Sequence, residues 1–386
     1  MSRCIGCGAI LQSTDKEKIG YIPPSADAES KMYCMRCFKI RNHNYDYSLE
    51  NIHTLTNQQE LQMLHHNYFN ALNEIRENNT LVLLIMDSLD IHNGFIPNLK
   101  KVIKNSPIWV LVNKCDLYPK SLKLKRIEEV IKEEANHLGL DLRNIFFISS
   151  LKLTNVDLIM KRIKESINKK GFNKTHIFVI GTTSVGKSTF INKIIEHYAE
   201  KDAKDVITTS QTSNTTKQNI YINIGKNYEG KDCFIVDTPG YLNESNLKSY
   251  LSINALKIID PKNAIKPKTY QLTSNQTFFI DKIVEMDTIL NNDNLSVSFF
   301  VSPLLYIHRT KMENKEKIKN NLDNFNVIKY NNEELNVLNN RKEMEFKIEK
   351  EADIWLSGLG FIHIVGSGMI KLSVPTFLKV NKDEII

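Results

Sequence analysis

Eight residues from Gly181 to Ser188 place glycine, lysine and hydroxyl side chains at a spacing that suits phosphate binding. They read Gly-Thr-Thr-Ser-Val-Gly-Lys-Ser and fit the pattern G-x-x-x-x-G-K-S. The glycines let backbone N–H groups wrap around phosphate oxygens at the start of a helix. We expect Lys187 to contact the β- and γ-phosphates of a nucleotide and the Ser188 hydroxyl to bind Mg²⁺. The expected nucleotide-binding residues of this loop are Gly181, Ser184, Val185, Gly186, Lys187, Ser188 and Thr189.

A second motif, Asp237-Thr-Pro-Gly240, directly follows the apolar run 233–236. An acid at the end of a strand can hold Mg²⁺ through water, and the Gly240 N–H can meet a γ-phosphate. Taken alone, the tetrapeptide is also compatible with a simple turn. Because it follows a phosphate-binding loop, we interpret it as the second half of one nucleotide site, with Asp237 on the magnesium side.

A third motif, Asn113-Lys114-Cys115-Asp116, comes after the apolar run 108–112. A carboxylate at Asp116 would accept hydrogen bonds from the guanine N1–H and exocyclic amine, a donor pair that adenine lacks. Asn113 would help to position the base, and the aliphatic part of Lys114 can lie over it. A four-residue match is weak by itself, because a surface loop is the alternative.

The order of these motifs along the chain is unusual for a nucleotide-binding protein. Ser149 and Ser150 follow the apolar run 145–148, where a guanine-supporting loop belongs, and together with Asp116 they favour guanine. Both base-reading segments precede the phosphate-binding loop, whereas ordinary GTPases place that loop first. The same sheet can be built from either order if the chain ends are rejoined. We therefore predict a circularly permuted P-loop GTPase domain.

Four of the six cysteines form two Cys-x-x-Cys pairs: Cys4, Cys7, Cys34 and Cys37. Nothing in the sequence indicates an oxidising compartment, and thiolates in a reducing one more often bind metal than form disulfides. Two tight loops that each present two sulfurs complete the tetrahedral site that Zn²⁺ accepts. Buried thiol pairs and a redox motif are the alternatives, although a redox pair would not come twice. We predict a structural zinc module over residues 1–48.

The composition sets limits on the class of protein. The 386 residues are 41% hydrophobic and 25% charged, which is typical of a globular chain too long for one core. The net charge of +7 leans only mildly toward nucleic acid. No apolar run reaches the roughly 18 residues of a membrane helix, and the N-terminus lacks an apolar signal core. We expect no membrane contact and a cytoplasmic protein, with an organellar matrix as the alternative.

Short apolar runs that alternate with helical patterns must position the motifs, and this alternation predicts an α/β layer with a mostly parallel sheet. An amphipathic helix over 57–77 precedes it, so we assign 49–79 to a helical linker and 80–256 to the GTPase domain. Beyond it, residues 257–386 are predicted to form a C-terminal α+β domain that binds RNA or protein. The expected strands are 81–86, 108–112, 145–148, 177–180, 220–224, 233–236, 277–280, 296–301 and 361–365, and the expected helices are 122–138, 156–167, 187–198 and a charged insert at 311–321.

The cysteine module, the permuted order and three C-terminal stretches resemble the YqeH family of bacterial ribosome-assembly GTPases. Those stretches are residues 257–272, Leu305-Tyr-Ile-His-Arg-Thr-Lys311 and Trp355-Leu-Ser-Gly-Leu-Gly360. The resemblance covers nearly the whole chain. It implies hydrolysis of GTP to GDP and phosphate, coupled to maturation of the small ribosomal subunit or its precursor, with ribosomal RNA as a partner. It also implies a C-terminal domain similar to an RNA-binding attenuation-protein fold.

Two departures from the family pattern affect the expected site. Ser184 stands where the family carries an asparagine that, in related GTPases, helps to hold K⁺, so stimulation by K⁺ stays uncertain. Ser213-Asn-Thr-Thr216 stands where the family has Pro-Gly-Thr-Thr. We assign the Mg²⁺ and γ-phosphate role to Thr216, with Thr215 second and plain loop threonines as the alternative. The expected catalytic residues are then Lys187, Thr216 and Gly240, and the expected magnesium ligands are Ser188, Thr216 and Asp237.

Tyr241 occupies the position after Asp-x-x-Gly where many signalling GTPases carry a glutamine that orients water. A tyrosine cannot take up the bidentate role of that glutamine, so we predict slow intrinsic turnover and a hydrolysis-activating partner. The alternative is that Tyr241 is a hydrophobic cap.

Two rival functions remain at this point, a P-loop ATPase or kinase and a non-catalytic, zinc-dependent RNA-binding scaffold. Contact with RNA would use basic side chains, each of which could equally be a solvated surface group. Outside the zinc module, the candidates are Lys262, Lys266, Lys268, His308, Arg309 and Lys311.

Overall fold

The computed structural model describes residues 10–15, 20–24, 34–35, 58–73, 75, 80–119, 122–168, 175–199, 219–291 and 294–383. The chain forms two compact units, described separately below. The first comprises Met1–Asp87, Gly94–Cys115 and Lys132–Leu242, and the second comprises Ser88–Asn93, Asp116–Ile131 and Asn243–Ile386. The domain limits expected from the sequence stay predictions. No helix among the described residues is long and apolar enough to cross a membrane.

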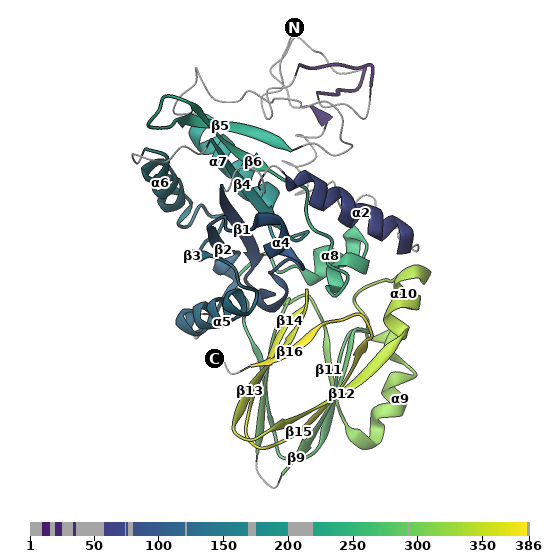
Figure 1. Ribbon diagram of the computed structural model, residues 1–386. Helices are drawn as coiled ribbons and strands as arrows, with labels where there is room; N and C mark the ends of the chain where they lie inside the picture. Colours follow the sequence, from purple (N-terminus) through teal and green to yellow (C-terminus); the bar gives the residue numbers. More distant parts are fainter. Residues whose placement is uncertain are drawn as a thin grey trace. The chain divides into compact units, whose positions relative to one another are not determined.

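A six-stranded sheet forms the centre of the first unit (Figure 1). Its strands lie in the order β3-β2-β1-β4-β6-β5, and all neighbours are parallel except β5, which runs antiparallel to β6. The strands are β1 (Leu81–Asp87), β2 (Ile108–Asn113), β3 (Leu142–Phe147), β4 (His176–Gly181), β5 (Ile220–Lys226) and β6 (Asp232–Asp237). β1 and β2 are buried along their whole length, as expected of apolar strands in the middle of a parallel sheet.

All six strands expected in this region are confirmed, with one difference at β3. The sequence pattern placed its start at Ile145, but the strand already begins at Leu142. Arg143 and Asn144 are exposed on this edge strand, so their polarity hid its first half.

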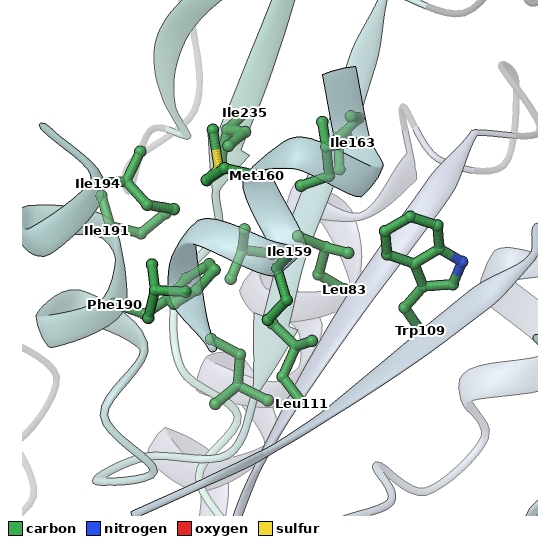
Figure 2. Close-up of a cluster of buried hydrophobic side chains, with 14 of the residues drawn as sticks. Leu83, Trp109, Leu111, Ile159, Met160, Ile163, Phe190, Ile191, Ile194 and Ile235 are labelled. Carbon is green, nitrogen blue, oxygen red and sulfur yellow. The ribbon is translucent and has the colours of Figure 1, made fainter. Parts of the chain in front are cut away.

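Among the residues described before position 200, the helices are α2 (Gln58–Ala71), α4 (Leu99–Ile103), α5 (Leu124–His137), α6 (Val156–Ile167) and α7 (Lys187–Ala199), with short 3₁₀ turns at Ile91–Asn93 and Cys115–Leu117. α6 and α7 bury their apolar sides against one face of the sheet (Figure 2). In α6 the buried positions recur at steps of three and four residues, as Ile159 and Ile163 illustrate. Phe190 and Ile194 do the same for α7.

The sheet brings the predicted motifs to one edge. Asp87, Asn113, Gly181 and Asp237 are the last residues of β1, β2, β4 and β6, which run parallel to one another. The register pairs Asp87 with Asn113 directly. Carboxyl ends of parallel strands are where open α/β sheets bind ligands.

The second unit contains two antiparallel five-stranded sheets, in the orders β16-β13-β14-β10-β7 and β11-β8-β9-β15-β12. The predicted strands at 277–280, 296–301 and 361–365 are confirmed as β8, β10 and β14, and the charged insert contains α9. The helices and 3₁₀ turns here are η4 (Leu247–Tyr250), α8 (Ile253–Ile259), η5 (Met312–Asn314), α9 (Lys315–Lys319), η6 (Leu322–Asn324) and α10 (Asn332–Asn339). The strands are β7 (Lys268–Leu272), β8 (Gln276–Ile280), β9 (Val284–Leu290), β10 (Leu295–Val301), β11 (Ile307–Lys311), β12 (Arg341–Ile348), β13 (Glu351–Leu356), β14 (Gly360–Val365), β15 (Gly368–Pro375) and β16 (Val380–Asp383).

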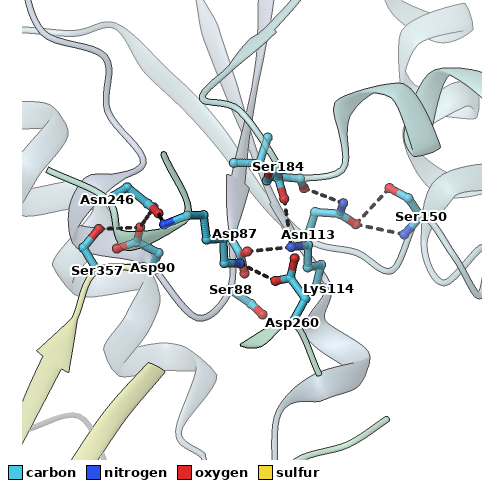
Figure 3. A network of polar contacts seen from close by, with 12 residues as sticks. Asp87, Ser88, Asp90, Asn113, Lys114, Ser150, Ser184, Asn246, Asp260 and Ser357 are labelled. Atoms are coloured by element: carbon cyan, nitrogen blue, oxygen red, sulfur yellow. Dashed lines mark hydrogen bonds and ion pairs between the residues drawn. The ribbon is translucent and has the colours of Figure 1, made fainter. Parts of the chain in front are cut away.

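A buried polar network centred on Asp90 holds part of the second unit together (Figure 3). One carboxylate oxygen of Asp90 accepts hydrogen bonds from Asn246 Nδ2 (2.6 Å) and Ser357 Oγ (2.8 Å). Ser357 Oγ in turn accepts from Asn93 Nδ2 (2.6 Å). Gly358, at φ +80°, leaves room for Asn246, whose side-chain oxygen would overlap any Cβ placed there. Ser357 and Gly358, within the stretch 355–360, are therefore both explained by this network.

We predict that Asp90→Ala destabilises the second unit by about 1.5–3 kcal/mol, because it removes the acceptor of the buried Ser357 hydroxyl and of the half-buried Asn246 amide. The chain has two tryptophans, so urea unfolding in a Trp109→Phe background can follow Trp355 in β13 alone. Asp323→Ala is the matched control, because Asp323 is 83% exposed and surface substitutions usually cost less than about 0.5 kcal/mol. An unchanged unfolding midpoint for Asp90→Ala would show that the network carries no stability.

Candidate functional site

The predicted phosphate-binding loop connects β4 to α7. Gly181 ends β4, and Lys187 begins α7. Gly186 adopts φ +89°, and a Cβ there would overlap the side-chain amide of Asn113. A Cβ at Gly181 would lie 2.6 Å from the backbone oxygen of Ile85. Both glycines of the pattern are therefore required by the close approach of β1 and of the loop after β2.

Asn113 joins three loops through one buried side chain (Figure 3). Its Nδ2 donates to the backbone oxygen of Val185 at 2.9 Å. Its Oδ1 accepts from the backbone N–H of Ser150 at 2.9 Å and from Ser150 Oγ at 2.8 Å. The side chain is only 2% exposed, so these bonds satisfy a polar group that has left water. The two base-reading segments and the phosphate-binding loop are thus brought together, as the motifs predicted.

Lys114 makes a second connection to the phosphate-binding loop. Its Nζ donates to Asp87 Oδ2 at 2.7 Å and to the backbone oxygen of Ser184 at 2.9 Å. Ser184 has φ +63°, a left-handed conformation that asparagine adopts more readily than serine. Sequence reasoning did not single out Asp87. The sequence does contain a signal for this residue: Asp87 is an acid that directly follows the apolar run 81–86, just as Asn113 directly follows the apolar run 108–112. In the structure the two residues are paired across β1 and β2.

Lys187 and Asp237 place opposite charges at the same edge of the sheet. Lys187 Nζ lies 3.5 Å from Asp237 Oδ1, and both side chains are largely buried. Asp237 Oδ1 has no hydrogen-bond partner among the described residues. A buried carboxylate oxygen beside an amine, next to glycine-rich backbone, is a donor set that fits a phosphate and its Mg²⁺.

Gly240 is held beside the phosphate-binding loop by the residue that follows it. Tyr241 N donates to the Gly181 oxygen at 3.0 Å, and the Tyr241 oxygen accepts from Thr183 N at 2.9 Å. A Cβ at Gly240 would lie 3.1 Å from Thr183 Cγ2, so the two segments are in close contact. Gly240, the predicted contact to a γ-phosphate, therefore lies beside the loop between β4 and α7. The ring of Tyr241 is buried and stacks on His65, in agreement with a hydrophobic cap.

The remaining predicted residues are placed as follows. Ser188 and Thr189 lie half-buried in the first turn of α7, and Asp116 lies in the 3₁₀ turn Cys115–Leu117, directly after Lys114. Ser149 Oγ accepts from Lys152 N at 3.1 Å and shapes the second base-reading loop.

Cys34 is buried, whereas Cys4, Cys7, Cys37 and Thr216 lie outside the described residues. Within the described ranges no group of three or more His, Cys, Asp or Glu residues could hold a metal ion.

Comparison with known proteins gives two family-model matches between residues 176 and 382 and relatives that align with larger parts of the chain. A family model described as 50S ribosome-binding GTPase matches residues 176–291, and a model described as YqeH-like, C-terminal, matches residues 294–382. The protein YqeH of Bacillus subtilis (strain 168) is 31% identical over 362 residues, which cover 94% of this chain and 92% of that protein. NO-associated protein 1, chloroplastic/mitochondrial, of Arabidopsis thaliana is 22% identical over 100% of this chain and 73% of its own length. GTPase Der of Karelsulcia muelleri (strain GWSS) is 24% identical over 66% of this chain and 56% of its own length.

Proposed function

This chain belongs to the YqeH family and is a GTP-binding, GTP-hydrolysing protein, and on that premise we propose that it acts as a switch in assembly of the small ribosomal subunit. The observation that carries the guanine-nucleotide part is the Asn113 side chain, which joins the base-reading segments to the phosphate-binding loop. The rival functions, an ATPase or kinase and a non-catalytic scaffold, are disfavoured by the match to a GTPase domain. We propose the cytoplasm as the compartment.

We further infer that the GTPase domain is circularly permuted. The strand order β3-β2-β1-β4-β6-β5 supports this, because the chain builds three strands on one side of the sheet before it reaches the phosphate-binding loop. The GTPase family model supports it too, since its match begins at residue 176 and leaves Asn113–Asp116 on the N-terminal side. In this order the segment after Gly240 runs directly into the C-terminal unit. Loss of a γ-phosphate at Gly240 can therefore act on that unit through the chain itself.

The proposed roles of the site residues follow from their positions. Lys187 neutralises charge on the β- and γ-phosphates, and the Ser188 hydroxyl and Asp237 hold Mg²⁺, directly and through water. Bound Mg²⁺ supplies further neutralisation of the triphosphate. Gly240 offers its N–H to the γ-phosphate, and Thr216 is proposed as the second contact to that phosphate and to the metal. Water is the nucleophile, because no protein nucleophile is evident in the site.

Zn²⁺ and K⁺ are two further candidate cofactors. We propose that Zn²⁺ is bound by Cys4, Cys7, Cys34 and Cys37; burial of Cys34 is compatible with a role as a metal ligand. Stimulation by K⁺ stays open, because Ser184 replaces the asparagine of the family.

Among the proposed RNA-contacting residues of the second unit, some are better placed than others. Lys262 and Lys266 are exposed. Arg309 is also exposed, and its guanidinium lies 5.7 Å from the centre of the Tyr270 ring, a cation–aromatic pair of the kind that can stack on bases. Lys311 Nζ lies 3.6 Å from Glu313, but both side chains are about 70% exposed, so the pair is weak.

Two other candidates, Lys268 and His308, have side chains that contact other residues of the protein. Lys268 Nζ donates to the Leu305 oxygen at 2.9 Å. The His308 ring lies 4.6 Å from the Phe325 ring, and burial lowers the pKa of His308 below its usual value. Burial therefore favours the neutral form of His308, which carries no charge for phosphate. We place the RNA contact on Lys262, Lys266, Arg309 and Lys311, and expect binding that weakens steeply with salt.

Co-sedimentation with purified ribosomal subunits tests the ribosomal part of the proposal. Small and large subunits are each mixed with the protein and a non-hydrolysable GTP analogue, GDP or no nucleotide. We expect binding to small subunits that appears with the analogue and falls with GDP. The description of the matched GTPase model favours a second candidate, the large subunit, and analogue-dependent binding to large subunits alone would establish that candidate instead. Equal or absent binding in all three states would remove the ribosomal assignment.

A further inference from the structure

Helix α2 contacts the segment that follows Gly240. The His65 ring stacks on the Tyr241 ring with centroids 4.7 Å apart and planes inclined by 12°. His65 Nε2 lies 3.0 Å from the Leu242 oxygen, a hydrogen bond from side chain to backbone. Tyr68 meets the Tyr241 ring edge-on at 5.3 Å, and Phe69 lies 6.1 Å from it. Tyr241 is only 6% exposed, so its side chain is fixed within the aromatic side chains of α2.

The backbone of Tyr241 is held by the phosphate-binding loop and not by α2. Its N–H and its carbonyl oxygen are both bonded to the phosphate-binding loop, at Gly181 and Thr183. Tyr241 therefore links α2, through its side chain, to the phosphate-binding loop, through its backbone. Gly240 immediately precedes Tyr241 in the sequence, so the attachments of Tyr241 limit where Gly240 can lie relative to the phosphate-binding loop.

The C-terminal end of α2 makes a further contact, through its backbone. Asn219 Nδ2 donates to the backbone oxygen of Ala71, the last residue of α2, at 3.0 Å. Asn219 lies shortly after Thr216 in the sequence and leads into β5. One helix thus contacts Tyr241, which follows Gly240, and Asn219, which precedes β5.

We propose that α2 is a positioning element for GTP hydrolysis, with His65 and Tyr241 as positioning residues that hold the Gly240 N–H where a γ-phosphate is sensed. Holding this segment in place before GTP binds reduces the conformational entropy that binding must remove. GDP has no γ-phosphate, so the effect applies to GTP and not to GDP. The inference depends on GTP binding alone, and a failure of the ribosomal proposal leaves it intact.

If α2 positions the Gly240 segment, displacement of α2 must change the affinity for GTP. Coupling between two sites is reciprocal, so a group that displaces α2 must weaken GTP binding, and GTP must oppose that displacement. The predicted zinc module, residues 1–48, precedes α2 in the sequence, and a partner bound there would change GTP affinity only if it moved α2.

The test compares His65→Ala with His66→Ala in the intact protein. His66 is the next residue of the same helix and is exposed, so it controls for the substitution itself. The dissociation constants for a non-hydrolysable GTP analogue and for GDP are measured with Mg²⁺, together with kcat and KM. For His65→Ala we expect the affinity for the analogue to fall about 5- to 30-fold, GDP affinity to stay within about twofold, and kcat to fall. His65→Phe, which keeps a ring against Tyr241, is expected to recover most of the lost affinity.

Other results would overturn the inference. An equal loss of affinity for both nucleotides would mean that His65 supports only the fold. A gain of affinity for the GTP analogue would mean that α2 restrains the segment against GTP. The same loss in His66→Ala, or no recovery in His65→Phe, would show that contact with Tyr241 is not the cause.

Discussion

Replacing Lys187 by alanine is expected to reduce GTP turnover by about 10²- to 10³-fold, the largest catalytic loss that we predict for a single substitution in this chain. The reason lies in the placement of the amine. Lys187 is largely buried at the start of α7, 3.5 Å from Asp237 Oδ1 and at the edge of the sheet that carries the phosphate-binding loop. Its charge acts where water is scarce, so it offsets phosphate charge far more strongly than an exposed lysine.

Lys161→Ala provides the control for this substitution. Lys161 is an exposed lysine of α6, in the same unit, and its removal is expected to leave turnover within about twofold. Single-turnover release of phosphate should be measured for both variants at saturating GTP. Turnover that survives in Lys187→Ala would contradict the assignment of this loop as the catalytic phosphate site.

Replacing Asp116 by asparagine is expected to change which base the protein accepts. An amide keeps one acceptor oxygen and presents a donor in place of the other, so one of the two guanine donors, the N1–H or the exocyclic amine, loses its acceptor and faces another donor. A well-made bidentate contact to a base is worth about 1–3 kcal/mol of discrimination, or about 5- to 150-fold in affinity. We expect GTP affinity to fall by at least that factor and affinity for xanthosine triphosphate to rise.

Competition between GTP, xanthosine triphosphate and ATP for a fluorescent nucleotide measures this change. Asp157→Asn is the matched control, because Asp157 is an exposed acid at the start of α6 and undergoes the same chemical change. A preference for GTP that stays the same in Asp116→Asn would mean that another residue reads the base. A wild-type preference for ATP would exclude guanine selection altogether.

The nucleotide site could be predicted from the sequence because its parts are short, contiguous motifs on predictable strands. Asn113, Val185 and Ser150 are brought together because the strands that carry them end at one edge of the sheet. Asp87 could not be found in this way. Its role depends on Lys114, and the pairing of β1 with β2 that places them together is a tertiary property.

The second unit was less predictable for a physical reason. Strands such as β12 alternate charged residues with half-buried ones, so Arg341, Glu343 and Glu345 conceal an otherwise regular strand. Its sheets are also completed by strands far apart in sequence, as in the pairing of β9 with β15. The contact of α2 with Tyr241 was equally hidden. Periodicity predicted the helix, but nothing in the sequence indicates which loop an aromatic side chain will meet.

The most direct test of the proposed switch is steady-state GTP hydrolysis by the intact protein, alone and with purified small or large ribosomal subunits. ATP is included as the competing nucleotide, and Lys187→Ala gives the background. We predict slow turnover of GTP alone, none of ATP, and stimulation by small subunits or their precursors that large subunits do not reproduce. Fast turnover without ribosomal components, or equal stimulation by both subunits, would contradict the account.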